Sequence, residues 1–130
     1  MSKIGLALGF SSVLLLVGCG TSAPIVDASY TVAQAQASHI RVQSAIYTAL
    51  KRRGWRLQSD NGEQIRASYN KQNRHIVNIK IDYTANRYQI EHVSSQGMKY
   101  NPKKNTIHRN YNRWIANLER DINADLSFQQ

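Results

Sequence analysis

The chain has 130 residues and a formal net charge of +9, with 17 lysines and arginines against 8 aspartates and glutamates. Hydrophobic residues make up 42% of the sequence and charged residues 19%, a balance that does not suggest wholesale disorder, and the length leaves room for one modest domain. Such an excess of positive charge indicates an anionic partner, whose class depends on where the protein is located.

The first 18 residues differ in composition from the rest of the chain. Lys3 is followed by an apolar run from Ile4 to Val17, shorter than the about 20 residues that a membrane-spanning helix needs. A positive start, a short apolar stretch and small residues at its end are typical of a cleavable export signal. We therefore expect residues 1–18 to be a signal peptide.

This signal ends in Leu16-Val17-Gly18-Cys19, which resembles the lipobox of bacterial lipoproteins. The resemblance implies lipidation of the Cys19 thiol, cleavage before this residue and acylation of the new amine. Cys19 is the only cysteine, so no intramolecular disulfide can form. Because Gly20 rather than aspartate follows, the resemblance favours the outer membrane, facing the periplasm. The alternative is an ordinary secretory leader with an incidental cysteine.

Residues 19–38 are predicted to be the lipidated cysteine and a tether, since glycine, serine, proline, alanine and glutamine dominate them. The later half, from Val32 to Ser38, could instead begin the first helix. That helix is predicted from about His39 to Arg53, where basic residues and Gly54 end it. Its apolar stripe, at helical spacing, is Val42, Ala45, Ile46, Ala49 and Leu50.

After Gly54 apolar and polar residues alternate, which is the period of a half-buried β-strand. Asn61-Gly62 is a strong hairpin signal, because both residues tolerate positive φ. We expect four antiparallel strands in a meander. Their apolar positions lie in the segments Trp55 to Leu57, Ile65 to Tyr69, Val77 to Tyr83 and Tyr88 to His92.

A loop from Ser94 to Asn105 precedes a second helix, which is predicted to begin at about Thr106 as its N-cap. Residues 39–130 are then one α+β domain of order α-β-β-β-β-α, with both helices on the apolar face of a four-stranded antiparallel meander. The predicted stripe of the second helix is Ile107, Tyr111, Trp114, Leu118 and Ile122.

The chain contains the short segments Ala49-Leu50, Arg53-Gly54-Trp55, Ile65-Arg66-Ala67, Ile81-Asp82-Tyr83, Ile107-His108 and Asn110-Tyr111-Asn112-Arg113-Trp114-Ile115. Together these segments resemble a family of small uncharacterised proteobacterial lipoproteins. The resemblance covers about residues 40–122 and supports the anchor and the fold. It implies no activity, because the family has no assigned chemistry.

Catalytic and metal-binding patterns are sparse. The four histidines show none of the spacings of a metal site, and no glycine-rich phosphate loop is present. A trio of Ser94 or Ser95, His108 and an acid lacks a nucleophile motif around the serines. We therefore expect a protein that is not an enzyme and that has no cofactor and no metal, with a small hydrolase as the least favoured alternative.

Two surfaces are candidates for binding. One is a groove lined by Tyr100, His108 and Asn112, whose aromatic and amide groups suit peptides or sugars; the alternative is that these residues cap, pack or face water. The other is a basic surface for an anionic partner, for which the alternative is a solvated face that aids solubility. Its predicted contacts are Arg56, Arg66, Lys80, Lys103 and Lys104.

Removal of the leader would remove only Lys3, so the mature chain would keep 16 cations, 8 acids and a charge of +8. Export and anchoring place this charge where nucleic acid is not the normal partner. We expect a non-enzymatic binding or assembly module of the envelope, held on the membrane by its N-terminal lipid and facing an anionic envelope polymer or an acidic protein. A structural accessory subunit of an envelope complex is the second hypothesis.

Overall fold

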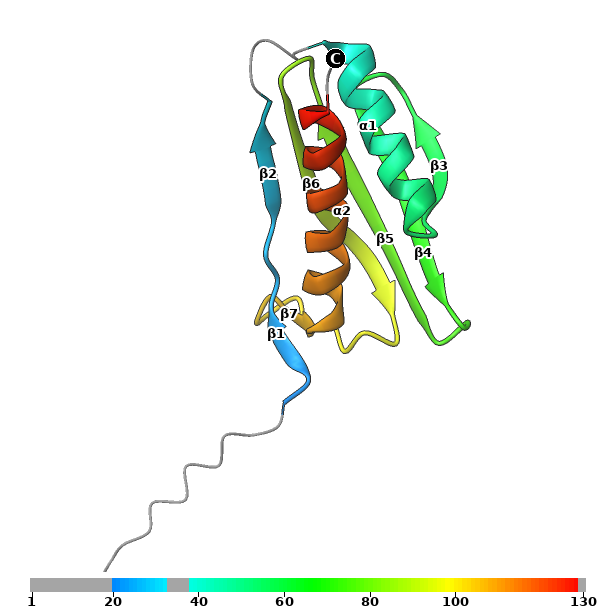
Figure 1. The fold of residues 1–130 in the computed structure, drawn as a ribbon. Coiled ribbons are helices and arrows are strands. Elements are labelled where there is room, and N and C mark those ends of the chain that lie inside the picture. Colours follow the sequence, from blue (N-terminus) through cyan, green and yellow to red (C-terminus); the bar gives the residue numbers. More distant parts are fainter. Residues whose placement is uncertain (1–19, 33–37, 129–130) are drawn as a thin grey trace, which may run out of the picture.

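The computed structural model describes residues 20–32 and 38–128, which form an α+β domain (Figure 1). Two helices, α1 His39–Arg52 and α2 Asn110–Ser127, cover one face of a five-stranded antiparallel sheet. The strand order is β2–β6–β5–β4–β3, with β2 Ala28–Thr31, β3 Arg56–Asp60, β4 Gln64–Lys71, β5 His75–Tyr83 and β6 Arg87–Gln96. A separate two-stranded sheet pairs β1 Ser22–Pro24 with β7 Thr106–His108.

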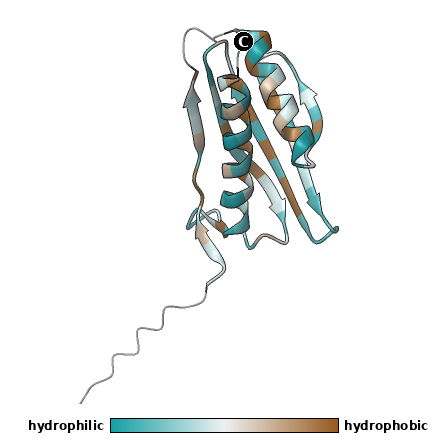
Figure 2. Cartoon of the chain, in the orientation of Figure 1, coloured by the Kyte–Doolittle hydropathy of each residue, from teal (hydrophilic) through white to brown (hydrophobic). Residues whose placement is uncertain are grey.

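The α+β class is confirmed, and the strands from β3 to β6 follow one another in space as they do in the chain. Alternation of apolar and polar residues is clear along β5 (Figure 2). Its side chains at Val77, Ile79, Ile81 and Tyr83 are buried beneath the helices, because every second residue of a strand faces the same side. The sequence pattern therefore identified the core face of the central strands.

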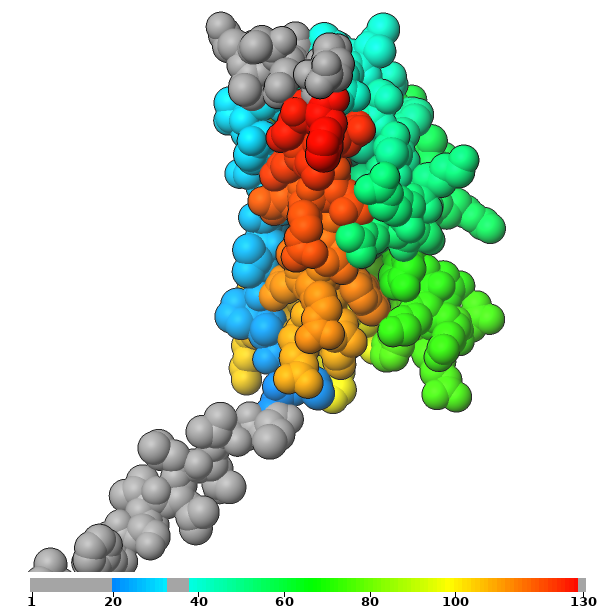
Figure 3. Space-filling model, viewed as in Figure 1, coloured from blue at the N-terminus to red at the C-terminus, as the bar shows by residue number. Residues whose placement is uncertain are grey.

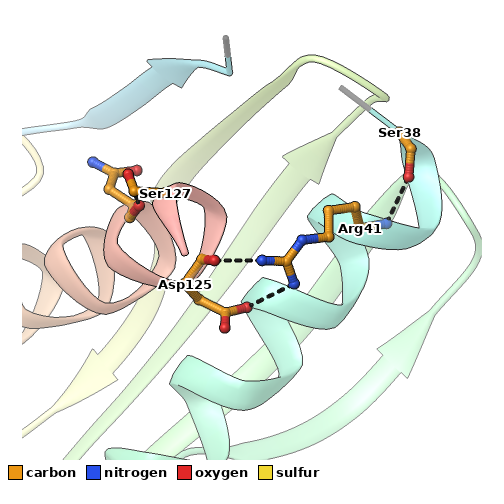
Figure 4. Close-up of polar contacts among 5 residues, drawn as sticks. Ser38, Arg41, Asp125 and Ser127 are labelled. Carbon is orange, nitrogen blue, oxygen red and sulfur yellow. Dashed lines mark hydrogen bonds and ion pairs between the residues drawn. The ribbon is translucent and has the colours of Figure 1, made fainter. Parts of the chain in front are cut away.

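The first helix begins and ends where its capping residues indicate. The Ser38 hydroxyl accepts a hydrogen bond from the Arg41 backbone N–H at 3.0 Å (Figure 4), which satisfies one free donor of the first turn. Arg53 caps the other end, and its backbone N–H donates to the Ala49 carbonyl oxygen. The five apolar residues predicted to face the core are all buried.

The segment expected to be a tether contributes two strands to the fold. Residues 22–24 pair with β7, and residues 28–31 form β2 at the edge of the main sheet, with Ala28 opposite Ile90. Ala28 and Val32 are buried, so this edge strand closes the core beside β6. The sheet consequently has five strands rather than four, because part of the predicted tether belongs to the fold.

The second helix begins later than predicted. Ile107 is completely buried as part of β7, and α2 starts at Asn110. Ile107 falls in helical register with Tyr111, so apolar spacing alone extended the helix by a turn, whereas the chain there is extended and pairs with β1. The observed buried stripe is Tyr111, Ile115, Leu118, Ile122 and Leu126, with Trp114 half-buried.

The two helices lie side by side over the sheet (Figure 3) and are joined by ion pairs. Arg41 near the start of α1 contacts Asp125 near the end of α2, with 3.3 Å between Nη1 and Oδ2, and also donates to the Asp125 carbonyl oxygen (Figure 4). Arg53, directly after α1, forms a second pair with Asp121 of α2. The order of these contacts along the two helices is that of an antiparallel pair.

Candidate functional site

The structure gives the predicted groove residues separate contacts. Asn112 joins α2 to the segment after β1, since its side-chain oxygen accepts from the Val26 N–H at 3.1 Å and its amide donates to the Pro24 carbonyl at 2.8 Å. His108 lies in β7, where its Nδ1 accepts from the Asn110 N–H at 3.1 Å. Both side chains therefore have local structural contacts, and a ligand-binding role for them stays a prediction.

Tyr100 packs on His92, which projects from β6 toward α2. The His92 ring centroid is 4.4 Å from that of Tyr100 and 5.4 Å from that of Tyr111. Its Nε2 lies 3.0 Å from the Ser95 hydroxyl, and burial lowers the pKa of His92. No carboxylate among the described residues hydrogen-bonds to this histidine, so the pair lacks the third group that orients a catalytic base.

On the main sheet, the uncovered face carries charges of both signs. Arg66 and Lys80 lie opposite each other on β4 and β5, and the Lys80 ammonium forms an ion pair with Glu91 at 3.3 Å. Asp82 on the same face accepts a hydrogen bond from Gln64 at 2.7 Å. The predicted contacts Arg56, Arg66 and Lys80 thus belong to a mixed surface, separate from Lys103 and Lys104.

Most of the excess positive charge lies at one end of the domain, which we call the basic end. Residues 20–26, 71–75 and 97–113 meet there (Figure 1) and contain no acidic residue. The rest of the described chain carries nine cations and all eight acids, so it is nearly neutral. The seven cations of the basic end are Lys71, Arg74, Lys99, Lys103, Lys104, Arg109 and Arg113.

Close backbone contact holds two segments of the basic end together. Gly97 has a φ of +71°, and a Cβ at this position would lie 2.0 Å from the Arg74 carbonyl oxygen. The His75 Nδ1 lies 2.9 Å from the Gly97 carbonyl oxygen, and the ring centroids of His75 and His108 are 6.2 Å apart. The turn between β4 and β5 is therefore fixed against the loop after β6.

That loop is itself ordered by one buried anchor and one asparagine. Met98 is buried, and its carbonyl oxygen accepts from the His108 N–H at 2.7 Å. The Asn101 side-chain oxygen accepts from the backbone N–H groups of Lys103 and Lys104 at 3.0 and 3.1 Å. Both lysines are held on a defined turn, with their side chains exposed.

The first described residues are attached to the basic end. The Lys99 ammonium donates to the Thr21 hydroxyl at 2.9 Å, and the Arg109 N–H donates to the Thr21 carbonyl oxygen at 2.7 Å. Strand β1 then continues along β7, with Ser22 opposite His108. The first residues that the structure describes therefore lie at the most basic part of the domain.

The positive charges of the basic end are not neutralised by ion pairs with other described residues. None of its seven cations forms an ion pair with any residue that the structure describes, whereas Arg41, Arg53 and Lys80 elsewhere each do. Burial, together with His75, Lys99 and Arg109, lowers the pKa of His108. The neutral imidazole therefore adds no further charge at neutral pH.

Sequence analysis identified Lys103 and Lys104 but missed the other five cations of the basic end. The sequence did contain one signal for some of them, which is the absence of acidic residues between Glu91 and Glu119. Lys71 and Arg74 could not have been found in this way, since they reach the same end only through the β4–β5 turn.

A surface hollow lies between α1 and the edge strand β3, away from the basic end. It has a volume of about 500 Å³, and its lining residues are Tyr47, Leu50, Lys51, Gly54, Trp55, Arg56 and Leu57. Leu57 was predicted to face the core, yet it is 43% exposed, since it lies on the edge strand beside an irregular register.

Comparison with protein-family models, curated proteins and solved structures finds no significant match to this chain. Neither helix of the described residues combines the length and the apolar character needed to cross a membrane. Within residues 20–32 and 38–128, no three histidine, aspartate or glutamate side chains come together as metal ligands would. Cys19 lies outside the described residues.

Proposed function

We propose that the protein is a lipid-anchored lipoprotein of the bacterial cell envelope and acts as a non-enzymatic binding module at the periplasmic face of the outer membrane. The observation that carries the proposal is the position of the basic end. Thr21, only two residues after Cys19, is hydrogen-bonded to Lys99 and Arg109. The lipobox and the binding charge would thus act at the same place.

The proposed partner is anionic material of the envelope. Seven cations in segments without an acidic residue create a positive potential that attracts anions over about 8 Å at physiological ionic strength. Nucleic acid would fit the charge but not the proposed location. The shared chemistry is therefore that of phosphate and carboxylate groups on a lipid or a polymer.

Lipidation can be tested with Cys19→Ser in the full precursor. We expect the wild-type protein to incorporate labelled palmitate and to sediment with membranes, whereas the variant incorporates none and keeps its signal. Ser12→Ala, a small change within the leader that spares the lipobox, serves as the control and should behave like wild type. A Cys19→Ser protein with the same lipid and mature length would contradict the anchor.

Binding can be tested by pull-down of the lipidated protein from its own membranes at increasing salt. A charge-driven partner should be lost by about 0.5 M NaCl, because the screening length falls to a few ångströms near 1 M. A partner that is retained in full at that salt would contradict the assignment of binding to the basic end.

The hollow beside β3 favours a second candidate, a structural accessory subunit of an envelope complex. The edge strand β3 offers free backbone groups, and its exposed Leu57 offers apolar area, to another protein. Leu57→Lys should abolish a stable co-purifying protein if this candidate is correct, while Lys103→Gln should leave that protein bound.

A further inference from the structure

We infer that the basic end is a second membrane-binding element, which lies on the anionic phospholipid headgroups of the membrane that holds the lipid anchor. The orientation of the domain in this inference rests on the proposed lipidation of Cys19. The affinity for headgroups rests on the charge of the basic end alone, so the two can fail separately.

Charge separation along the domain gives the inference its first support. The basic end carries seven cations and no acid, whereas the rest of the described chain carries nine cations and eight acids, among them Asp125, which is paired with Arg41. An anionic surface would therefore attract the basic end more strongly than the nearly neutral rest of the domain.

The short connection to the anchor gives the second support. From Cys19 to Thr21 the chain can extend at most about 7 Å, which is less than the screening length of about 8 Å at physiological ionic strength. Thr21 is itself bonded to Lys99 and Arg109. A lipid on Cys19 would place headgroups beside these cations without any long tether.

This link also favours phospholipid over a soluble polymer. Joining two binding elements through a short connection makes the second contact intramolecular, with a high effective concentration of its target. The headgroups around the anchored lipid have this advantage, whereas a polymer must reach the same cations by diffusion. A polybasic patch beside a lipid anchor is a common combination of membrane contacts.

The basic end also presents its groups in an ordered way. Gly97 and Met98 fix the loop that carries Lys99, Lys103 and Lys104, so little ordering is needed when they bind. Tyr100 in the same loop is 40% exposed. A tyrosine at this position suits the boundary between headgroups and acyl chains, since its ring is apolar and its hydroxyl is polar.

The test uses the mature chain from residue 19 to 130 with Cys19→Ser, so that no lipid contributes. We expect it to sediment with phosphatidylglycerol-containing vesicles but not with phosphatidylcholine vesicles, and to be released at about 0.5 M NaCl. Adding Lys99→Gln, Lys103→Gln and Lys104→Gln should weaken vesicle binding about 100-fold, at about five-fold for each cation. Circular dichroism verifies that each variant is folded.

The matched control replaces three exposed arginines elsewhere, Arg52→Gln, Arg87→Gln and Arg120→Gln, with the same change in net charge. This variant should bind vesicles within a few-fold of the parent protein. Equal loss in both triple variants would overturn the inference, since net charge alone would then explain binding. Binding to soluble polyglutamate without binding to vesicles would also overturn it and would make an acidic polymer the partner.

Orientation can be measured on the lipidated protein in phosphatidylglycerol vesicles by amine labelling and mass spectrometry. Lys103 and Lys104 should be protected relative to the detergent-solubilised protein, whereas Lys51 should label equally in both. Equal labelling of all three would overturn the orientation. If palmitate labelling shows that Cys19 carries no lipid while the vesicle results hold, the anchor is wrong and the headgroup site stands.

Discussion

Arg53, directly after α1, and Asp121 of α2 form a bidentate ion pair, with 2.7 Å from Nε to Oδ2 and 3.0 Å from Nη2 to Oδ1. Asp121 is 8% exposed and is the one buried charged residue among those described. The hydrogen bonds from Arg53 hold the pKa of Asp121 below its usual value. Removing the carboxylate charge leaves the guanidinium without its partner at the helix interface.

We expect Asp121→Asn to lower the thermal unfolding midpoint by several degrees, as measured by circular dichroism. Asp125→Asn is the matched control, because the Asp125 side chain is 34% exposed against 10% for Asp121, and exposed carboxylates contribute little through ion pairs. Equal loss of stability in both variants would contradict the prediction that the more buried carboxylate of Asp121 contributes more to stability.

Asp60 is the acceptor at the centre of a polar network beneath α1. It accepts hydrogen bonds from Tyr47, from Gln43 at 2.8 Å and from Tyr83 at 2.9 Å. Burial raises the pKa of Asp60, but these bonds and one from the Gly62 N–H outweigh it and lower the pKa to about 2. The same contact with Asp60 raises the pKa of Tyr47 to about 12.

These shifts predict loss of stability at both extremes of pH. Because the folded state favours ionised Asp60, its contribution is present above about pH 4 and is lost as the pH falls toward about 2. Because the folded state favours neutral Tyr47, its contribution is lost as the pH rises from 10 through about 12. Urea midpoints measured across this range provide the data.

Asp60→Asn should be less stable than wild type at neutral pH, and its stability should fall less steeply as the pH is lowered. Glu63→Gln, an exposed neighbour on the same turn, should keep the wild-type profile. An equally steep fall in stability at low pH in wild type and Asp60→Asn would contradict the assignment of this pH dependence to Asp60.

Gly97 is required at the basic end for two reasons, its positive φ and its contact with the Arg74 backbone. Gly62 has a φ of +89°, but a Cβ added there would meet no atom within 4 Å, so it separates the two effects. Gly62→Ala should cost about 1–2 kcal/mol in the free energy of unfolding through backbone strain. Gly97→Ala should cost more, and equal costs by urea denaturation would contradict the close contact.

Tyr111 and Tyr88 differ in how their buried hydroxyl groups are satisfied. Among the residues described, the Tyr111 hydroxyl is the buried side-chain group without a hydrogen-bond partner, whereas that of Tyr88 donates to Asn123 at 2.5 Å. Tyr111→Phe should therefore keep or raise stability, and Tyr88→Phe should lose about 1 kcal/mol. Chemical denaturation measures the change in stability of both variants. A larger loss of stability for Tyr111→Phe than for Tyr88→Phe would contradict the prediction.

Sequence periodicity was sufficient for elements that bury one continuous face. The helical stripe from Val42 to Leu50 and the alternation along β5 each repeat often enough to be read without the fold. The short strands β1, β2 and β7 have three or four residues each, too few for a period to emerge. Their pairing depends on partners far away in the chain, such as Ala28 with Ile90.

The candidate site divides in the same way. Net charge, the lipobox resemblance and the lysines at positions 103 and 104 follow from the order of residues, because they are local or summed properties. The gathering of seven cations near residue 20 does not follow from the order of residues. It requires the β4–β5 turn to contact Gly97 and β1 to pair with β7. Electrostatic potential depends on distances in space, and only the tertiary structure determines those.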